Sequence, residues 1–253
     1  MSVVLENVRM AGRPSQRPLF DGLSLHVADR SRTGILGTSK SGKSTLLRLI
    51  CGTKLPDDGL VKRDVRSSWP IPLSSFTVAA QTVARNIRFI ARLYGIDDED
   101  FPRRIADMVE LTEFLNVPLG KCPKFARARL GFALGVGIDF DMYLFDGSFA
   151  PTDKPFKEKA AEISAARVAD RGFIVATSVP VEVEDRCDSV YVLEEGRATY
   201  FAQPEEGIEH FKELLAIEKK KQRDAHKGEA EDEGDVELDD LGMTGIAATG
   251  LIE

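Results

Sequence analysis

The sequence predicts an α/β fold with a mainly parallel central sheet, an antiparallel β edge and a helical insert. First, a phosphate-binding motif over residues 37–45 stands between a short β-like run and a helix with apolar spacing. Second, an apolar run that ends in Asp146 is typical of a buried central strand. Third, further strand candidates alternate with helical segments, and this order around a phosphate loop forms a largely parallel sheet.

The first 30 residues predict the antiparallel edge. Apolar and polar positions alternate in two runs, and the turn-rich residues 12–15 separate these runs. The apolar positions are Val3, Leu5 and Val8 in the first run and Leu23, Leu25 and Val27 in the second. Such alternation indicates strands with one buried face.

The phosphate-binding motif matches the pattern G-x-x-x-x-G-K-[ST] in full. Its residues are Gly37, Thr38, Ser39, Lys40, Ser41, Gly42, Lys43, Ser44 and Thr45. Glycines let backbone amides curl around an anion, Lys43 can neutralise β- and γ-phosphate oxygens, and the Ser44 hydroxyl can hold Mg²⁺. A chance match in a chain of this length has a probability of about one in a hundred from average residue usage. We therefore interpret the segment as a nucleotide site, with a Gly- and Ser-rich surface turn as the alternative.

The segment after this motif predicts a turn, a strand and then a group of helices. Residues 56–59 have turn composition and residues 60–65 have the pattern of a short strand. Helical spacing follows over residues 83–93, 101–115 and 126–137. The chain therefore carries a helical insert over about residues 83–137, between the two nucleotide motifs.

Asp146 is the second candidate site residue. It ends the apolar run 142–146, and in P-loop proteins a carboxylate in this place reaches Mg²⁺ directly or through water. Asp also commonly ends a strand for turn reasons, so this signal is weak by itself. The apolar runs 173–177 and 189–193 predict further parallel strands, and residues 196–201 predict a last strand after a turn.

Length, charge and cysteine content limit the class of protein. The chain has 253 residues and a formal net charge of -7, which predicts one main domain and argues against a protein built for nucleic acid. Cys51, Cys122 and Cys187 lack metal-ligand spacing, which indicates a reduced cytoplasmic setting. No apolar run approaches the roughly 18 residues that span a bilayer, so we expect any membrane role to depend on a partner.

The last part of the chain differs in composition from the rest. Between Glu229 and Asp240, eight of twelve residues are acidic, and a mixed-charge run over residues 218–227 precedes them. Such a segment buries too little apolar surface to offset its ordering entropy. We therefore divide the chain into a nucleotide-binding domain, residues 1–216, and a charged, disordered tail, residues 217–253, which could bind a basic partner surface.

The order of these elements resembles the nucleotide-binding subunits of ABC transporters. Within that class, Ser68-Trp69-Pro70, residues 86–95, Tyr143-Leu144-Phe145-Asp146 and Cys187-Asp188 resemble the ATPases that energise export of capsular polysaccharides and related surface glycans. The likeness covers roughly residues 2–215. It implies a P-loop NTPase fold of ABC type that binds ATP and Mg²⁺. It also implies a multi-spanning membrane permease as partner, a homodimer or a heterodimer with a second ATP-binding subunit, and a peripheral position on the inner face of the cell membrane.

Three departures from the resembling family concern hydrolysis. Gly147 stands where the family has a catalytic Glu that polarises the attacking water, and a glycine cannot act as a base. Ser178 aligns with the family's switch His, which contacts the γ-phosphate. Lys124-Phe125 aligns with the signature Ser-Gly pair that caps the nucleotide of the opposite subunit, where a bulky side chain would obstruct phosphate.

Three further departures concern the nucleotide and the permease. The family's Mg²⁺-sensing Gln aligns near Thr77, with Gln81 as a displaced candidate, and no aromatic residue stands near Gly12 to stack on adenine. Lys40 replaces a glycine of the phosphate loop. A helix of the permease docks beside the insert in this family, which makes four apolar residues candidates for that contact unless they pack in the core. These are Trp69, Ile71, Leu73 and Phe76.

These observations predict the ATP-binding subunit of an exporter of capsular or related surface polysaccharide whose hydrolysis is lost or strongly impaired, and we assign no catalytic residue. One alternative is an active ATPase of the same exporter class that uses Asp153, Ser178 or Lys40 in place of the missing groups. A second is a non-catalytic adaptor on a degenerate fold. A partitioning or switch ATPase is disfavoured because Lys40 occupies the fourth loop position rather than the second.

Overall fold

The computed structural model describes residues 2–12, 17–72, 77–150 and 152–232, with side chains described as far as Lys219. The chain divides into two units, Met1–Lys212 and Glu213–Glu253. The first unit carries both sheets and all the candidate site residues.

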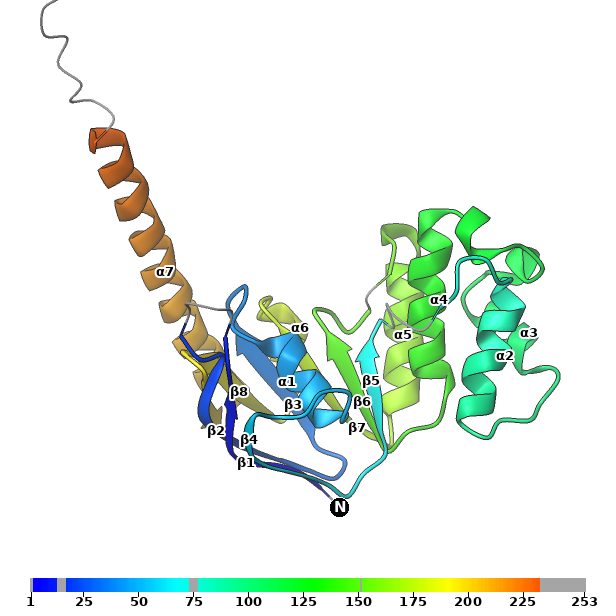
Figure 1. Ribbon diagram of the computed structural model, residues 1–253, viewed down its shortest axis with the longest axis horizontal. Coiled ribbons are helices and arrows are strands. Elements are labelled where there is room, and N and C mark those ends of the chain that lie inside the picture. The colour runs from blue at the N-terminus through cyan, green and yellow to red at the C-terminus, as the bar shows by residue number, and fades with distance from the viewer. Residues whose placement is uncertain (1, 13–16, 73–76, 151, 233–253) are drawn as a thin grey trace, which may run out of the picture. The chain divides into compact units, whose positions relative to one another are not determined.

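The central sheet of the first unit has the strand order β5-β6-β7-β3-β8-β9. The neighbouring strands from β5 to β8 in this order are parallel (Figure 1). The last strand, β9, runs antiparallel to β8. The strands are β3 (Arg32–Gly37), β5 (Ser67–Ile71), β6 (Met142–Asp146), β7 (Gly172–Thr177), β8 (Ser189–Glu194) and β9 (Arg197–Phe201). This topology confirms the predicted α/β fold with a mainly parallel sheet, and it brings the carboxyl ends of β3, β6 and β7 to one edge.

The antiparallel edge forms a sheet of its own, with the order β2-β1-β4. Its strands are β1 (Ser2–Met10), β2 (Phe20–Ala28) and β4 (Asp58–Arg63). The apolar residues that alternate along β1 and β2 are buried and their polar neighbours are largely exposed. The sequence pattern therefore predicted both strands and their buried face.

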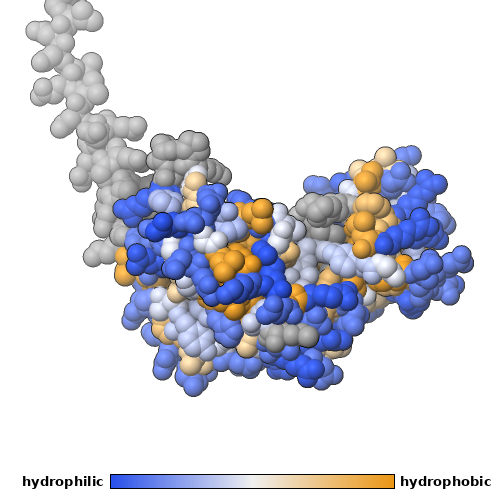
Figure 2. Space-filling view, turned by 60° about the horizontal axis from the view of Figure 1, so that its bottom comes forward, coloured by the Kyte–Doolittle hydropathy of each residue, from blue (hydrophilic) through white to orange (hydrophobic). Residues whose placement is uncertain are grey.

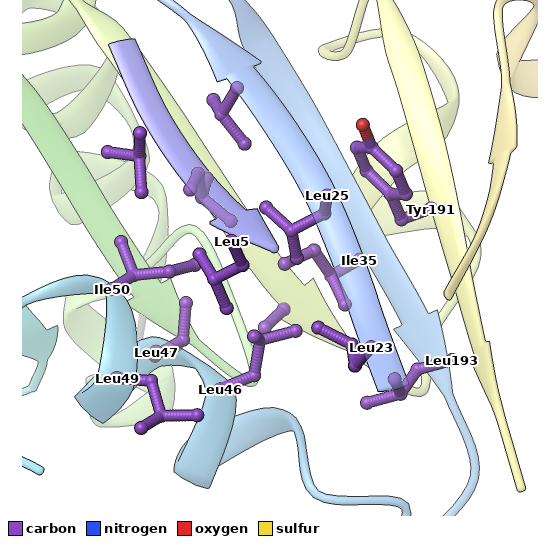
Figure 3. Packing of buried hydrophobic residues seen from close by; sticks show 14 of the residues in the cluster. Leu5, Leu23, Leu25, Ile35, Leu46, Leu47, Leu49, Ile50, Tyr191 and Leu193 are labelled. Carbon is purple, nitrogen blue, oxygen red and sulfur yellow. The ribbon is translucent and has the colours of Figure 1, made fainter. Parts of the chain in front are cut away.

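The helix α1 (Lys43–Ile50) packs into the main core, among residues of both sheets. Its buried side chains are Leu46, Leu47, Leu49 and Ile50. They belong to a cluster with Leu5 and Leu23 of the antiparallel sheet and with Ile35 and Leu193 of the central sheet (Figure 3). The burial of these aliphatic side chains between the two sheets fixes the position of the helix. Each side chain contributes about 1.5–3 kcal/mol to the free energy of folding.

The helical insert lies between β5 and β6 in the sequence. It consists of α2 (Val83–Leu93), α3 (Phe101–Met108), the 3-10 helices η1 (Thr112–Phe114) and η2 (Leu119–Lys121), and α4 (Lys124–Gly137). The helix predicted over residues 101–115 ends at Met108, because Glu110 adopts a φ of 59° and reverses the chain. A Cβ on Gly135 of α4 would lie 2.6 Å from Ile71, so a small residue permits close packing of α4 on β5.

Trp69 and Ile71 belong to the interior rather than to a docking surface. Ile71 is fully buried, and the Trp69 ring lies 5.4 Å from Tyr94 and 5.6 Å from Phe140. The expectation that these two residues face a permease is therefore wrong, because they fill the space between β5 and the insert. Leu73 and Phe76 lie outside the described residues.

The molecular surface of one face is mainly hydrophilic, with separate apolar patches (Figure 2). On α2, the large apolar side chains of Phe89 and Leu93 are 51% and 62% exposed, which makes this helix the stronger candidate for a partner contact. None of the helices within the described ranges is long and apolar enough to cross a membrane.

The remaining helices of the first unit follow β6 and β7. They are η3 (Lys154–Phe156), α5 (Lys157–Val168) and α6 (Val181–Glu184). The last helix, α7 (Pro204–Asp232), begins in the first unit and continues into the second. It therefore extends through residues 217–232, where we predicted a disordered tail, because the segment is rich in Glu, Lys and Ala, which favour helix. Residues 233–253 lie outside the described ranges.

We expect truncation after Ala216 to leave the melting temperature of the chain nearly unchanged. Among the residues whose side chains are described, the last buried apolar ones are Ile208 and Phe211, which this truncation retains. Truncation after Gln203 removes both and should lower Tm by several degrees, at roughly 2–4 °C per kcal/mol for a chain of this size. Thermal unfolding followed by circular dichroism measures both effects. Equal loss of Tm in the two truncated chains would place the residues after 216 in the stable core.

Candidate functional site

The phosphate loop connects β3 to α1 at the carboxyl edge of the central sheet. Its first turn is closed by a hydrogen bond from the Ser41 N–H to the Thr38 carbonyl, at 3.2 Å. Gly42 precedes the helix with a φ of 102°, and a Cβ there would lie 2.8 Å from the Phe20 ring. Glycine is therefore required at this position both for its backbone conformation and for the close approach of Phe20.

Lys43 lies within the curve of this loop. Its Nζ donates hydrogen bonds to the carbonyls of Gly37, at 2.8 Å, and Thr38, at 2.6 Å, and lies 3.5 Å from the Ser41 hydroxyl. These contacts hold the ammonium group beside the loop amides. A cation and backbone N–H groups that face the same space attract the oxygens of a phosphate group.

Ser44 and Asp146 meet although 102 positions separate them in the chain. The Ser44 hydroxyl donates a hydrogen bond of 3.0 Å to Oδ1 of Asp146. Ser44 lies in the first turn of α1, and Asp146 ends β6, which β7 separates from β3. A hydroxyl and a carboxylate are oxygen ligands that suit Mg²⁺, which is usually bound by one or two carboxylates together with substrate phosphates and water. Within the described part of the chain, no cluster of three His, Cys, Asp or Glu residues could hold a metal ion by itself.

Gly147 extends no side chain toward the loop, and its backbone is fixed to the end of β7. Its N–H donates to the Ala176 carbonyl at 2.7 Å, and its own carbonyl accepts from the Thr177 hydroxyl at 2.7 Å. The φ of Gly147 is 95°, although the space around a Cβ would be open. A side chain here is disfavoured by backbone conformation rather than by crowding.

The side chain of Ser178 contacts the backbone of the phosphate loop. The Ser178 hydroxyl donates to the Gly37 carbonyl at 2.7 Å, the same oxygen that accepts from Lys43. This bond ties the segment after β7 to the first residue of the loop. It also occupies the hydroxyl that we considered as a substitute for a switch His.

Glu182 is a buried carboxylate that sequence reasoning missed. Its Oε1 accepts from the Ser148 hydroxyl at 2.9 Å and its Oε2 accepts from the Phe149 N–H at 3.1 Å. Arg186 lies 3.8 Å from Oε2 and balances part of the charge. These bonds fix the segment that follows Asp146. No motif marks Glu182 in the sequence, because its role depends on contact between α6 and a distant loop.

Lys124 and Phe125 begin α4, where the resembling family has its signature pair. The Phe125 ring packs edge-on against Phe114, with centroids 6.1 Å apart, and lies 5.0 Å from the Arg129 guanidinium. The side chain is 37% exposed. An aromatic ring thus stands in the first turn of α4 and packs against Phe114 and Arg129.

Arg129 holds α4 to the segment after β6. Its Nε and Nη2 donate to Oδ1 and Oδ2 of Asp153 at 2.7 Å and 2.9 Å, and Nη1 lies 3.1 Å from Glu110. The guanidinium also lies over the ring of Phe156, 4.4 Å from the ring centroid. This bidentate pair lowers the pKa of Asp153 and raises that of Arg129, because each charge stabilises the other. Asp153 is therefore bound to Arg129 and is not available as a base.

The two remaining positions contribute little to the loop. Oε1 of Gln81 accepts from Arg85 at 3.2 Å, so its side chain contacts α2. Gly12 follows β1, and the neighbouring Ala11 N–H donates to Asp57 at 2.6 Å. The structure thus brings Lys43, Ser44, Asp146 and Ser178 together around the loop and places Gln81 and Asp153 in other contacts.

Comparisons with known proteins give a consistent family. The family profile described as ABC transporter matches residues 20–127. The chain is 32% identical to the ATP-binding protein BexA of Haemophilus influenzae, over 78% of this chain and 91% of that protein. It is 31% identical to the capsule polysaccharide export ATP-binding protein CtrD of Neisseria meningitidis serogroup B, over 85% and 99% of the two chains. It is 28% identical to the polysialic acid transport ATP-binding protein KpsT of Escherichia coli, over 83% and 96%.

Solved structures agree on the fold. A structure titled as the ATP binding subunit of an ABC transporter superposes with a TM-score of 0.69, at 18% identity, over 80% of this chain and 90% of that one. At this identity the likeness concerns the fold alone.

We expect Arg129→Met to lower the free energy of unfolding by roughly 3 kcal/mol, because it leaves the largely buried Asp153 carboxylate without its cation. The double variant Arg129→Met/Asp153→Asn should recover part of this loss, since the remaining group is neutral. Urea unfolding of the two single variants and the double variant measures the coupling. A loss under about 0.5 kcal/mol in Arg129→Met, the range of ordinary surface changes, would show that the pair does not stabilise the fold.

The same pair gives a pH dependence with a defined sign. The folded-state pKa of Asp153 is lower than its unfolded value, so the contribution is fully present above about pH 4, the usual Asp pKa. It is lost as the pH falls through the lower, folded-state pKa. We therefore expect wild type to exceed Asp153→Asn in stability at pH 7 and the difference to shrink at acid pH. A difference that grows on acidification would contradict this assignment.

Proposed function

Because this chain belongs to the ABC transporter family of ATP-binding proteins, we propose that it is the ATP-binding subunit of an exporter. The exported substrate would be capsular or related surface polysaccharide. ATP hydrolysis by this subunit would be lost or strongly impaired. The substrate class is inferred from relatives whose names state capsule polysaccharide export and polysialic acid transport. The chain covers almost the full length of these relatives, which supports transfer of the role of the whole subunit rather than of one motif.

The observation that best supports nucleotide binding is the contact between Ser44 and Asp146 beside Lys43. On this proposal, residues 37–45 hold the phosphates of ATP through loop amides and the Lys43 ammonium. Ser44 and Asp146 would hold Mg²⁺, which neutralises charge on the phosphates when it is bound. The two groups come from separate elements and already lie 3.0 Å apart, so little reorganisation is needed to bind one ion.

Loss of hydrolysis is inferred from the groups that face the phosphates. Gly147 offers no carboxylate to orient water, and its positive φ disfavours any replacement. The Ser178 hydroxyl donates to the loop carbonyl. Phe125 places a bulky aromatic ring in the first turn of α4, which disfavours close approach of phosphate from the nucleotide of a second subunit. These groups act as a unit in catalysis, so their combined absence removes most of the rate enhancement.

The structure weighs against an active ATPase with rebuilt chemistry. Of the three substitutes that we considered, Asp153 is bound to Arg129 and Ser178 is bound to Gly37. Lys40 carries neither a carboxylate nor an imidazole, the groups that most often orient and deprotonate an attacking water. A non-catalytic adaptor on a degenerate fold is the weaker alternative, because the phosphate motif is complete and Ser44 contacts Asp146.

The subunit would work with a membrane partner and with a second ATP-binding subunit. The subunit would dock on a multi-spanning membrane permease at the inner face of the cell membrane and would pair with itself or with a second ATP-binding subunit. A homodimer would have two defective sites. Pairing with an intact relative would leave one site without the Glu and His and the other without the signature, so neither arrangement contains a complete site.

We expect the purified chain to bind Mg-ATP and Lys43→Ala to weaken this binding at least about tenfold, because charge-assisted contacts contribute about 1.5–3 kcal/mol. Isothermal titration calorimetry measures the affinity. Lys54→Ala, which changes an exposed lysine outside the loop, is the control and should bind like wild type. Asp146→Asn should weaken binding with Mg²⁺ present more than without it. Absence of binding at millimolar ATP, or equal binding by Lys43→Ala, would refute the nucleotide site.

We expect negligible phosphate release by the wild-type chain, and no recovery in Gly147→Glu. The new carboxylate would enter a backbone with a φ of 95° and would lack a switch His and a partner signature. Gly147→Ala introduces the same strain without a carboxylate, and both variants should lose about 1 kcal/mol of stability. A malachite green assay measures the release. Robust turnover that Lys43→Ala abolishes would support the active alternative instead.

A further inference from the structure

Lys40 occupies a backbone position that normally requires glycine. It is the third residue of the four-residue turn 38–41, which the Ser41 N–H closes on the Thr38 carbonyl. Its φ is 70°, in the left-handed region. Turns with a positive φ at the third residue strongly prefer glycine there, because a Cβ crowds the neighbouring carbonyl. The chain therefore retains a long side chain at a site where it strains the backbone.

Lys40 is exposed to solvent in the phosphate loop, and no ion pair of Lys40 is present among the residues that the structure describes. Lys43, three positions later, directs its ammonium group into the loop against the carbonyls of Gly37 and Thr38. One short anion-binding segment thus carries a solvent-exposed lysine and a second lysine that is bonded to carbonyls of the loop.

We propose that Lys40 is a nucleotide-binding residue that contacts the phosphate chain of bound ATP from the solvent side of the loop. The inference rests on the proposed nucleotide site and adds a residue to it. Strain that persists in a functional loop points to a role for the side chain, since glycine would be more stable there. The flexible four-carbon stem of lysine lets its ammonium group reach an oxygen that the loop amides leave exposed to solvent.

If Lys40 binds the nucleotide, its replacement by glycine should stabilise the fold and at the same time weaken ATP binding. Lys40→Gly relieves the backbone strain and removes the charge, so it should raise Tm and weaken ATP binding. Lys40→Gln removes the charge but keeps a side chain on the strained backbone, and Lys40→Arg keeps both. Comparison of the three variants separates the effect of charge from the effect of conformation.

Arg30 provides a matched control. It is also an exposed cation with a positive φ, of 57°, and it lies in the turn between β2 and β3 rather than in the phosphate loop. Arg30→Gly therefore removes one positive charge and relieves similar strain away from the site. The ATP affinity of Arg30→Gly therefore shows how much the loss of one positive charge and the gain in stability affect binding by themselves.

The experiment measures Tm and the affinity for Mg-ATP of the full chain at low and high salt. We expect both glycine variants to raise Tm by about 2–4 °C. Lys40→Gly and Lys40→Gln should lower the affinity about fivefold at low salt and less at high salt, as for an exposed charge pair, while Lys40→Arg and Arg30→Gly stay near wild type.

The role of Lys40 can fail by itself or together with the proposed nucleotide site, and the experiment distinguishes these results. If Lys43→Ala abolishes binding while Lys40→Gly and Lys40→Gln bind ATP like wild type, the nucleotide site stands and Lys40 has no part in it. If the wild-type chain does not bind ATP at all, the proposed function fails and the role of Lys40 fails with it. An equal loss of affinity in Arg30→Gly would attribute the effect to net charge and would also refute a local contact.

Discussion

A phosphate loop works only if both of its ends are held in place, and in this chain the burial of α1 does so. The four large aliphatic residues of α1 are fully buried among side chains of both sheets. Gly42 allows Phe20 to pack against the beginning of the helix, and Gly37 ends the central strand β3. Because the helix cannot shift without opening the core, the Ser44 hydroxyl stays within reach of Asp146.

The loops after β6 and β7 form a second fixed layer around the phosphate loop. Gly147 bonds to the end of β7 through both of its peptide groups, and Glu182 accepts two hydrogen bonds from the residues that follow. Ser178 joins this layer to the carbonyl of Gly37. These hydrogen bonds give the segment around Gly147 a well-bonded local structure.

The insert is connected to this layer by a charged pair rather than by apolar contacts alone. Arg129 reaches from α4 to Asp153, and the rings of Phe125 and Phe156 lie near its guanidinium. The contacts of Phe125 at the start of α4 are therefore structural. Phe125 packs on its own helix and on Phe114, so this end of the insert is stabilised within the chain.

The sequence by itself determined the features that depend on local order and on periodicity. The phosphate motif is contiguous, the strands of the antiparallel sheet have period-two burial, and Asp146 ends an apolar run, so all three could be predicted. Only the tertiary structure decided that Ser44 meets Asp146, that Glu182 binds the loop after β6, and that Asp153 binds Arg129. It also placed Trp69 and Ile71 in the core. These contacts join residues from separate elements, and their distances are set by strand order, register and packing, which no local pattern encodes.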